Sequence, residues 1–177
     1  VNQPTEITGT TKQLVNQLSD IIKFVYEKFG NEISISLVGH SMASDIVIRA
    51  SADKRIKSVV AISPYSTGIT KDFPKDLLLV SGQFENHLRL HALQMVKIFK
   101  PEVKENTEYA DEKIRRKASF IDNTGHVSVI YAPQTTRIII DWLKLDNYDR
   151  PFWKTQIGWI IIGVTLIVFG MSRLNAN

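Results

Sequence analysis

Short apolar runs alternate with segments of helical periodicity between residues 10 and 143, and this alternation is the feature that most constrains the fold. The predicted strands are 33–38, 56–62, 77–80 and 117–121, and the predicted helices are 10–29, 42–52, 88–99 and 135–143. Strands that alternate with helices are joined by right-handed crossovers, which give a mainly parallel sheet covered by helices on both faces. The sequence therefore predicts a three-layer α/β domain, with functional residues just beyond the carboxyl ends of the strands.

The composition fits a globular domain and argues against several kinds of site. Hydrophobic residues (44%) and charged residues (23%) occur in the proportions of a folded chain. The net charge of +4 comes from scattered cations, whose densest cluster spans only residues 113–117, so we expect no nucleic-acid partner. We interpret this cluster as a solvated approach to a strand. The chain has no cysteine, and His87 and His91 lack a third ligand, so we expect no metal and no cofactor.

An uncharged segment near the C-terminus predicts a membrane anchor. Residues 155–172 are rich in Ile, Val, Leu and Phe, with tryptophans at one end and with Lys154 and Arg173 as flanks. A helix of this length spans about 27 Å, close to the hydrocarbon thickness of roughly 30 Å. We predict a domain over 1–145, a linker over 146–154, a transmembrane helix over 155–172 and a tail over 173–177. A buried C-terminal helix is the alternative. More cations precede the segment than follow it, which favours a cytoplasmic domain.

The segment 36–43 places a serine between a predicted strand and a predicted helix. It reads Ser-Leu-Val-Gly-His-Ser-Met-Ala. A serine on such a sharp turn exposes its hydroxyl, and its neighbours must be small because the strand and helix backbones come together. Gly39 meets this need, and Ala43 stands where the motif G-x-S-x-G has its second glycine. Ser41 is therefore a candidate nucleophile, and the backbone N–H of Met42 is a candidate oxyanion donor at the start of a helix.

The run Val-Gly-His-Ser-Met-Ala, followed by further strand-and-helix units, resembles the α/β-hydrolase superfamily over residues 10–145. In that family an Asp or Glu follows a later strand and a histidine follows the last strand. Glu85 stands three residues after Gly82, which follows the strand 77–80, and the pair Gly125-His126 follows the last predicted strand. The resemblance implies a partial α/β-hydrolase fold with a triad of Ser41, Glu85 and His126.

Such a triad implies a serine hydrolase that cleaves an ester, thioester or similar acyl bond through an acyl-serine intermediate. The histidine would accept the serine proton, and the carboxylate would hold the required tautomer. Other acids fit less well, because Asp72 and Asp76 precede their strand and Asp122 lies very close to His126 in sequence. We interpret His40 as a spacer beside the nucleophile.

The family pattern also includes strands before the nucleophile strand, and one of their loops supplies a second oxyanion donor. We expect these strands upstream of Val1, and we expect strand 33–38 to be an unpaired edge within this chain. The loop over 63–75 is too short for a large cap domain. We therefore expect an open pocket that takes a small-molecule or lipid-like acyl substrate, with substrate-binding residues Tyr65, Phe84 and Val127.

A different class of function also fits the sequence. The chain could be a non-catalytic α/β-hydrolase-like module that serves membrane-associated interaction or assembly, because Ala43 departs from the motif and the second oxyanion donor is not in this chain. The anchor could also belong to a larger membrane domain with several spans. The sequence leaves the oligomeric state and the substrate open.

Overall fold

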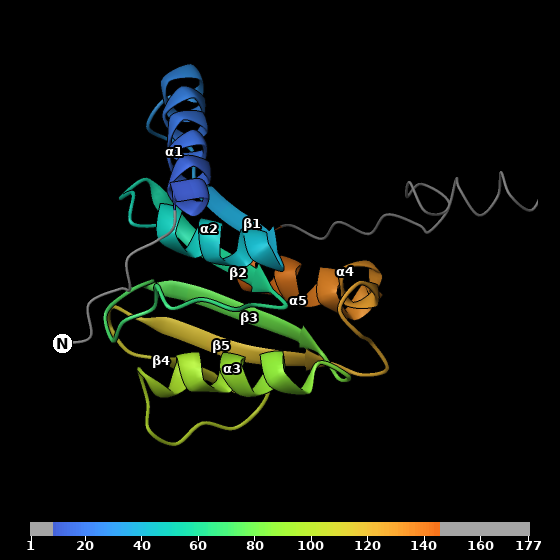
Figure 1. The fold of residues 1–177 in the computed structure, drawn as a ribbon. Coiled ribbons are helices and arrows are strands. Elements are labelled where there is room, and N and C mark those ends of the chain that lie inside the picture. Colours follow the sequence, from blue (N-terminus) through green and yellow to red (C-terminus); the bar gives the residue numbers. More distant parts are fainter. Residues whose placement is uncertain (1–8, 146–177) are drawn as a thin grey trace, which may run out of the picture. The chain divides into compact units, whose positions relative to one another are not determined.

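The computed structural model describes residues 9–145 and has an α/β fold built on a five-stranded, mostly parallel sheet (Figure 1). In chain order the elements are α1 (Gly9–Phe29), β1 (Ile35–His40), α2 (Met42–Ala50), β2 (Ile56–Ile62), β3 (Asp76–Gly82), α3 (Asn86–Lys97), β4 (Glu108–Ala110), β5 (Arg115–Ile121), α4 (Ser128–Tyr131) and α5 (Pro133–Leu143). The predicted linker and transmembrane segment lie outside the described residues. Within 9–145, no helix is long and apolar enough to cross a bilayer.

The strands lie in the order β1-β2-β3-β5-β4, and only β4 runs antiparallel to its neighbour. The carboxyl ends of β1, β2, β3 and β5 therefore meet at one edge of the sheet, as the alternating pattern predicts. As expected, β1 lies at the side of the sheet and pairs only with β2 within the described part of the chain. The three-residue β4 was not predicted, because it lies in a polar stretch without an apolar period.

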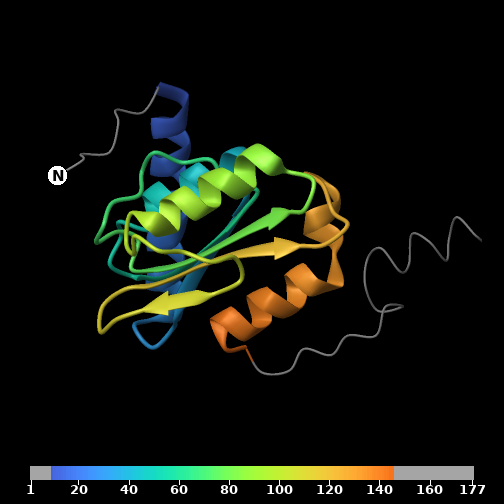
Figure 2. The same ribbon diagram turned by 90° about the horizontal axis from the view of Figure 1, so that it is seen from below.

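Helices cover both faces of the sheet, and the burial of each strand shows why its sequence is continuously apolar. In β2, Val59 and Ala61 pack toward α1, α2 and α3, whereas Val60 and Ile62 pack toward α4 and α5. Successive side chains of a strand alternate between faces, so both sets must be apolar. Figure 2 shows the two layers, with α3 and α5 on opposite sides of the sheet.

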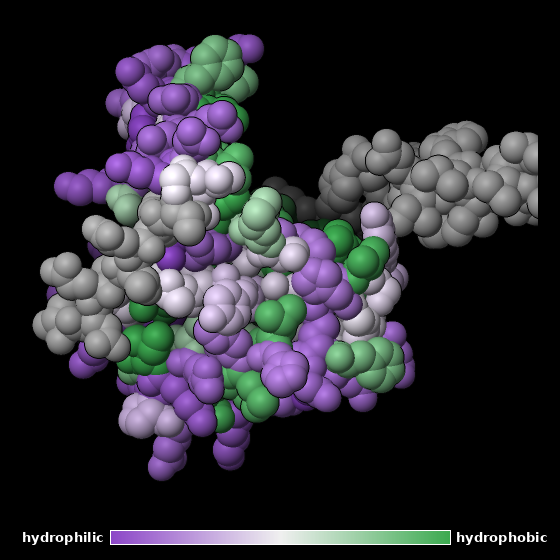
Figure 3. Space-filling model, viewed as in Figure 1, coloured by the Kyte–Doolittle hydropathy of each residue, from purple (hydrophilic) through white to green (hydrophobic). Residues whose placement is uncertain are grey.

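Helix α1 has a wider apolar face than the rest of the domain covers. Ile22 is buried in the core, and Val15 and Leu18 pack against it. Ile21 and Phe24 are 57% and 60% exposed, and Figure 3 shows hydrophobic side chains on α1 beside hydrophilic ones. The exposed apolar surface of α1 and the unpaired edge of β1 thus leave the β1 side of the domain incompletely covered.

The basic cluster over 113–117 is not a solvated approach to a strand, because β5 begins at Arg115 and includes Arg116. Arg116 is fully buried, and its Nη2 donates to the carbonyl oxygens of Thr70, Lys71 and Pro74 at 2.7, 3.2 and 3.2 Å. Burial lowers the pKa of Arg116 to about 10. The side chain holds the loop before β3 against the sheet, a role that the apolar pattern could not reveal.

Replacing Gly39 tests how closely β1 and α2 approach each other. A Cβ at this position would lie 2.5 Å from the carbonyl oxygen of Ala43 and 2.8 Å from Cγ2 of Val47. We expect Gly39→Ala to lower the free energy of unfolding by about 1–3 kcal/mol, because backbone atoms of α2 must move. The matched control is Gly125→Ala, whose Cβ would meet no atom within 4 Å. Urea denaturation measures both, and equal midpoints for the two variants would contradict this packing.

Candidate active site

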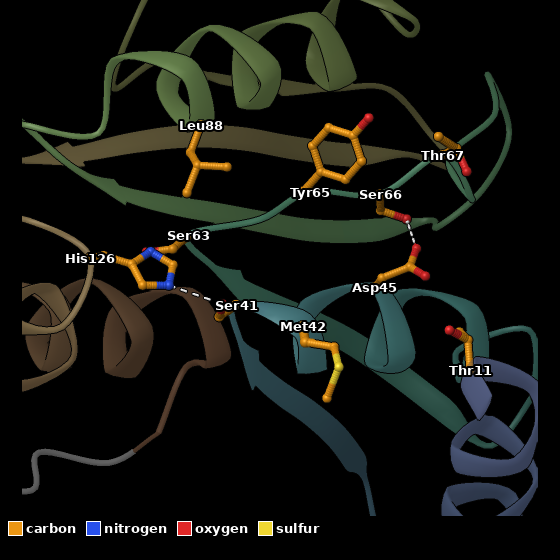
Figure 4. Close-up of a pocket in the computed structure, with 10 residues that line it drawn as sticks. All are labelled: Thr11, Ser41, Met42, Asp45, Ser63, Tyr65, Ser66, Thr67, Leu88 and His126. Atoms are coloured by element: carbon orange, nitrogen blue, oxygen red, sulfur yellow. Dashed lines mark hydrogen bonds between the residues drawn. The ribbon is translucent and has the colours of Figure 1, made fainter. Parts of the chain in front are cut away.

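Three side chains from separate elements meet at the carboxyl edge of the sheet. Ser41 lies between β1 and α2, Glu85 lies between β3 and α3, and His126 follows β5. Nε2 of His126 is 2.9 Å from Oγ of Ser41, and Nδ1 of His126 is 2.6 Å from Oε1 of Glu85. Figure 4 shows the imidazole facing the serine hydroxyl. These three residues, separated by 44 and 41 positions in the sequence, form a continuous hydrogen-bonded chain.

The backbone at Ser41 adopts a conformation that L-residues rarely occupy, with φ of 56° and ψ of −122°. Its N–H donates to the carbonyl oxygen of Ile62 at 2.9 Å, and its own carbonyl accepts from the backbone N–H of Ser44 at 2.9 Å. Such strain costs of order 1–3 kcal/mol and persists only where the surrounding structure enforces it. Here the neighbouring strand and the first turn of α2 enforce it, and the hydroxyl is held at the cavity wall.

Glu85 is almost completely buried, and both of its carboxylate oxygens have partners. Its Oε2 accepts from the hydroxyl of Ser63 at 2.8 Å and from the backbone N–H of Gly82 at 2.6 Å, while Oε1 faces His126. Rotation of the carboxylate would break all of these bonds. Ser63 is a residue of the candidate site that the sequence analysis missed. Its one sequence signal is its place directly after β2, and in the structure its φ is positive at 48°.

The loop that carries His126 is fixed against β3. The backbone N–H of Phe84 donates to the carbonyl oxygen of Thr124 at 3.0 Å, which brings the loop over the end of β3. A Cβ at Gly82 would lie 2.5 Å from that same carbonyl oxygen, so the crossing requires glycine there. At its far end, the loop carbonyl of His126 lies 2.8 Å from Nε2 of His40. His40 therefore contacts the histidine loop and is more than a spacer.

A cavity of about 300 Å³ opens beside the Ser41 hydroxyl. Its lining residues are Thr11, Ser41, Met42, Asp45, Ser63, Tyr65, Ser66, Thr67, Leu88 and His126 (Figure 4). Of the residues predicted to bind substrate, Tyr65 lines this cavity. Phe84 and Val127 do not line it and are exposed, although each is the sequence neighbour of a residue of the hydrogen-bonded chain.

The lining of this cavity combines polar and apolar side chains. Met42 and Leu88 are apolar, and Asp45 and Ser66 are polar (Figure 4). The Ser66 hydroxyl donates to Oδ1 of Asp45 at 2.5 Å, and Arg49 pairs with Oδ2 of the same carboxylate at 2.9 Å. The Asp45 charge is therefore compensated. The backbone N–H of Met42 is in the first turn of α2, where N–H groups lack partners within the helix and favour an anion.

The other candidate acids have no contact with the imidazole of His126. Asp76 lies at the amino end of β3, where it binds Nε of Arg115 at 2.6 Å and Nε1 of Trp142 at 2.8 Å. Asp72 and Asp122 are exposed. Glu85 is thus the carboxylate that meets the imidazole.

The histidines on α3 do not form a metal site. His87 is exposed, and the ring of His91 stacks on Tyr65 with centroids 4.4 Å apart. Among residues 9–145, no group of three His, Cys, Asp or Glu side chains is placed to hold a metal ion.

Comparisons with known proteins add no identification. No model of a protein family matches the chain, and a search of curated proteins found no similar sequence.

Paired substitutions at Ser41 measure the backbone strain of the turn. Ser41→Ala and Ser41→Gly both remove the hydroxyl, but only glycine adopts a φ of 56° without a steric penalty. We expect the free energy of unfolding of the glycine variant to be higher by about 1 kcal/mol, because relief of strain exceeds the entropy cost of glycine. The glycine variant should therefore unfold at a higher urea concentration. At Ser51, where φ is −71°, the order of the two variants should be reversed. An alanine variant at position 41 as stable as the glycine variant would contradict a strained turn.

Proposed function

We propose that this protein is a serine hydrolase of the α/β-hydrolase type that cleaves an ester or related acyl bond. The observation that carries the proposal is the continuous contact from Ser41 through His126 to Glu85, at 2.9 and 2.6 Å. A buried carboxylate on one ring nitrogen leaves the other nitrogen free to accept a proton from the serine. The strained turn at Ser41, the N–H of Met42 and the adjacent cavity support the same reading.

The proposed reaction has two steps. In the first, Oγ of Ser41 bonds to the acyl carbon while its proton passes to Nε2 of His126. The tetrahedral intermediate then expels the leaving group, which takes that proton, and the acyl group stays on the serine. In the second step, His126 takes a proton from water as the water oxygen attacks the acyl carbon. Release of the acid returns the proton to Ser41. The Glu85 carboxylate stabilises the imidazolium that forms.

Charge that develops on the acyl oxygen would be stabilised at the start of α2. The N–H of Met42 lies next to the nucleophile in sequence and at the positive end of the helix. Such preorganised donors are effective because they need no reorganisation as charge develops. The size of the cavity and the apolar side chains of Met42 and Leu88 in its lining favour a small or slender acyl group.

A fluorophosphonate probe tests this proposal on the full-length protein. Attack by Ser41 forms an oxygen–phosphorus bond and breaks the phosphorus–fluorine bond, and the proton leaves with fluoride through His126. We expect rapid labelling of the wild type, none in Ser41→Ala, and rates lowered at least about 10³-fold in His126→Ala. Exposed His87 provides the matched control, since His87→Ala should label like the wild type.

An unlabelled wild-type protein would contradict the proposal. It would instead support a non-catalytic module that keeps the arrangement of side chains without the reaction. Labelling that persists in Ser41→Ala would show that another nucleophile reacts.

Removing the Ser63 hydroxyl tests whether the Glu85 carboxylate must be held in place. Ser63→Ala deletes a hydrogen bond to a buried carboxylate, and we expect stability to fall by about 2 kcal/mol and probe labelling to slow about tenfold. The control is Ser81→Ala, because the Ser81 hydroxyl is buried without a hydrogen-bond partner in the described structure. Equal effects of the two substitutions on labelling would mean that Ser63 acts only through packing.

A further inference from the structure

We propose that His40 is a positioning residue, which holds the backbone of the His126 loop beside the nucleophile. The inference rests on the proposed function and goes beyond it, because it assigns a role to a residue outside the hydrogen-bonded chain Ser41–His126–Glu85. Its basis is the contact between Nε2 of His40 and the carbonyl oxygen of His126, at 2.8 Å. A carbonyl oxygen can only accept, so Nε2 of His40 carries the proton and donates it.

The sheet order shows where such a contact acts. β1 is the first strand and β5 the fourth, so three strand spacings separate them. At about 4.8 Å per spacing, the loop after β5 must extend roughly 14 Å along the sheet edge to bring His126 to Ser41. Contacts near the start of the loop, such as Phe84 N–H to the carbonyl of Thr124, hold it on β3. These contacts act at Thr124, near β3, and not at His126, which lies beside the end of β1.

Among the described residues, His40 supplies the hydrogen bond from β1 to the backbone of this loop. The remaining contact on that side, from Nε2 of His126 to Oγ of Ser41, is the one that must change during the reaction. Beyond the loop, Val129 of α4 is buried in the core and fixes the chain after residue 127, whereas the His40 bond acts at residue 126 itself. His40 acts on a carbonyl oxygen that takes no part in proton transfer, so its bond can persist through both steps.

The position of His40 in the sequence strengthens the argument. It is the last residue of β1 and directly precedes Ser41, so the donor and the nucleophile share one rigid strand end. The two imidazole rings are 4.8 Å apart at their centroids and tilted by 44°. His40 is half-buried and contacts the histidine loop, and it is not among the residues that line the cavity.

Two substitutions separate the hydrogen bond from the bulk of the ring. His40→Ala removes both, whereas His40→Gln keeps an N–H donor at nearly the same distance from the backbone. Hydrolysis of p-nitrophenyl acetate by the full-length protein then gives kcat and KM. We expect His40→Ala to lower kcat about 10- to 100-fold with little change in KM, because a displacement of about 1 Å costs that much. His40→Gln should recover most of the rate, and His87→Ala should match the wild type.

Hydrogen exchange of the amides over 122–127 provides a measurement that needs no catalysis. We expect faster exchange in His40→Ala and near wild-type exchange in His40→Gln. Should the alanine variant not fold, the glutamine variant decides alone. Wild-type hydrogen exchange and a wild-type kcat in His40→Gln support the inference, whereas faster exchange together with a lowered kcat overturns it. Unchanged exchange and kcat in His40→Ala would also overturn it. A wild type that neither hydrolyses the ester nor reacts with fluorophosphonate contradicts the proposed function, while the exchange measurement still tests the loop contact.

Discussion

The loop after β5 must cross the end of β3 before His126 can reach Ser41, and the architecture of the site depends on this crossing. Parallel strands bring their carboxyl ends to one edge, but the sheet order keeps β1 and β5 apart. Gly82 lets the loop pass close over β3, since a Cβ there would strike the carbonyl of Thr124. Glu85 follows β3, which lies between β1 and β5 in the sheet. It can bind the imidazole because the crossing brings the loop directly over it.

The polar groups of the site are held by many partners because each would be costly to bury alone. Glu85 receives hydrogen bonds from Ser63 and Gly82 in addition to its contact with His126. An unpartnered carboxylate at that depth would lose far more than one hydrogen bond is worth. The strain at Ser41 is offset in the same way, by the backbone bonds that fix the turn. Stability of the domain and geometry of the site are therefore linked through a few residues.

Much of the fold and of the site could be predicted from the sequence, and the failures have a common physical cause. Apolar periodicity located the parallel strands, the strand-to-helix turn pointed to Ser41, and the resemblance to the α/β-hydrolase superfamily pointed to Glu85 and His126. Arg116 was misinterpreted because a charged residue can be buried when backbone carbonyls bind it. The roles of Ser63 and His40 were missed for a related reason. Contacts between a side chain and a distant loop depend on the path of that loop, and periodicity does not encode the path.

The most direct test of the central claim is the tautomer of His126 at neutral pH, observed by nitrogen NMR in histidine-labelled protein. With four histidines in the chain, the signal can be assigned by substitution. We predict a proton on Nδ1, whose proton resonance lies far downfield because it is bound to Glu85, and an unprotonated Nε2 that accepts from Ser41. This downfield signal should vanish in Glu85→Gln. A neutral His126 with its proton on Nε2 would contradict the account, because that nitrogen could not take the serine proton.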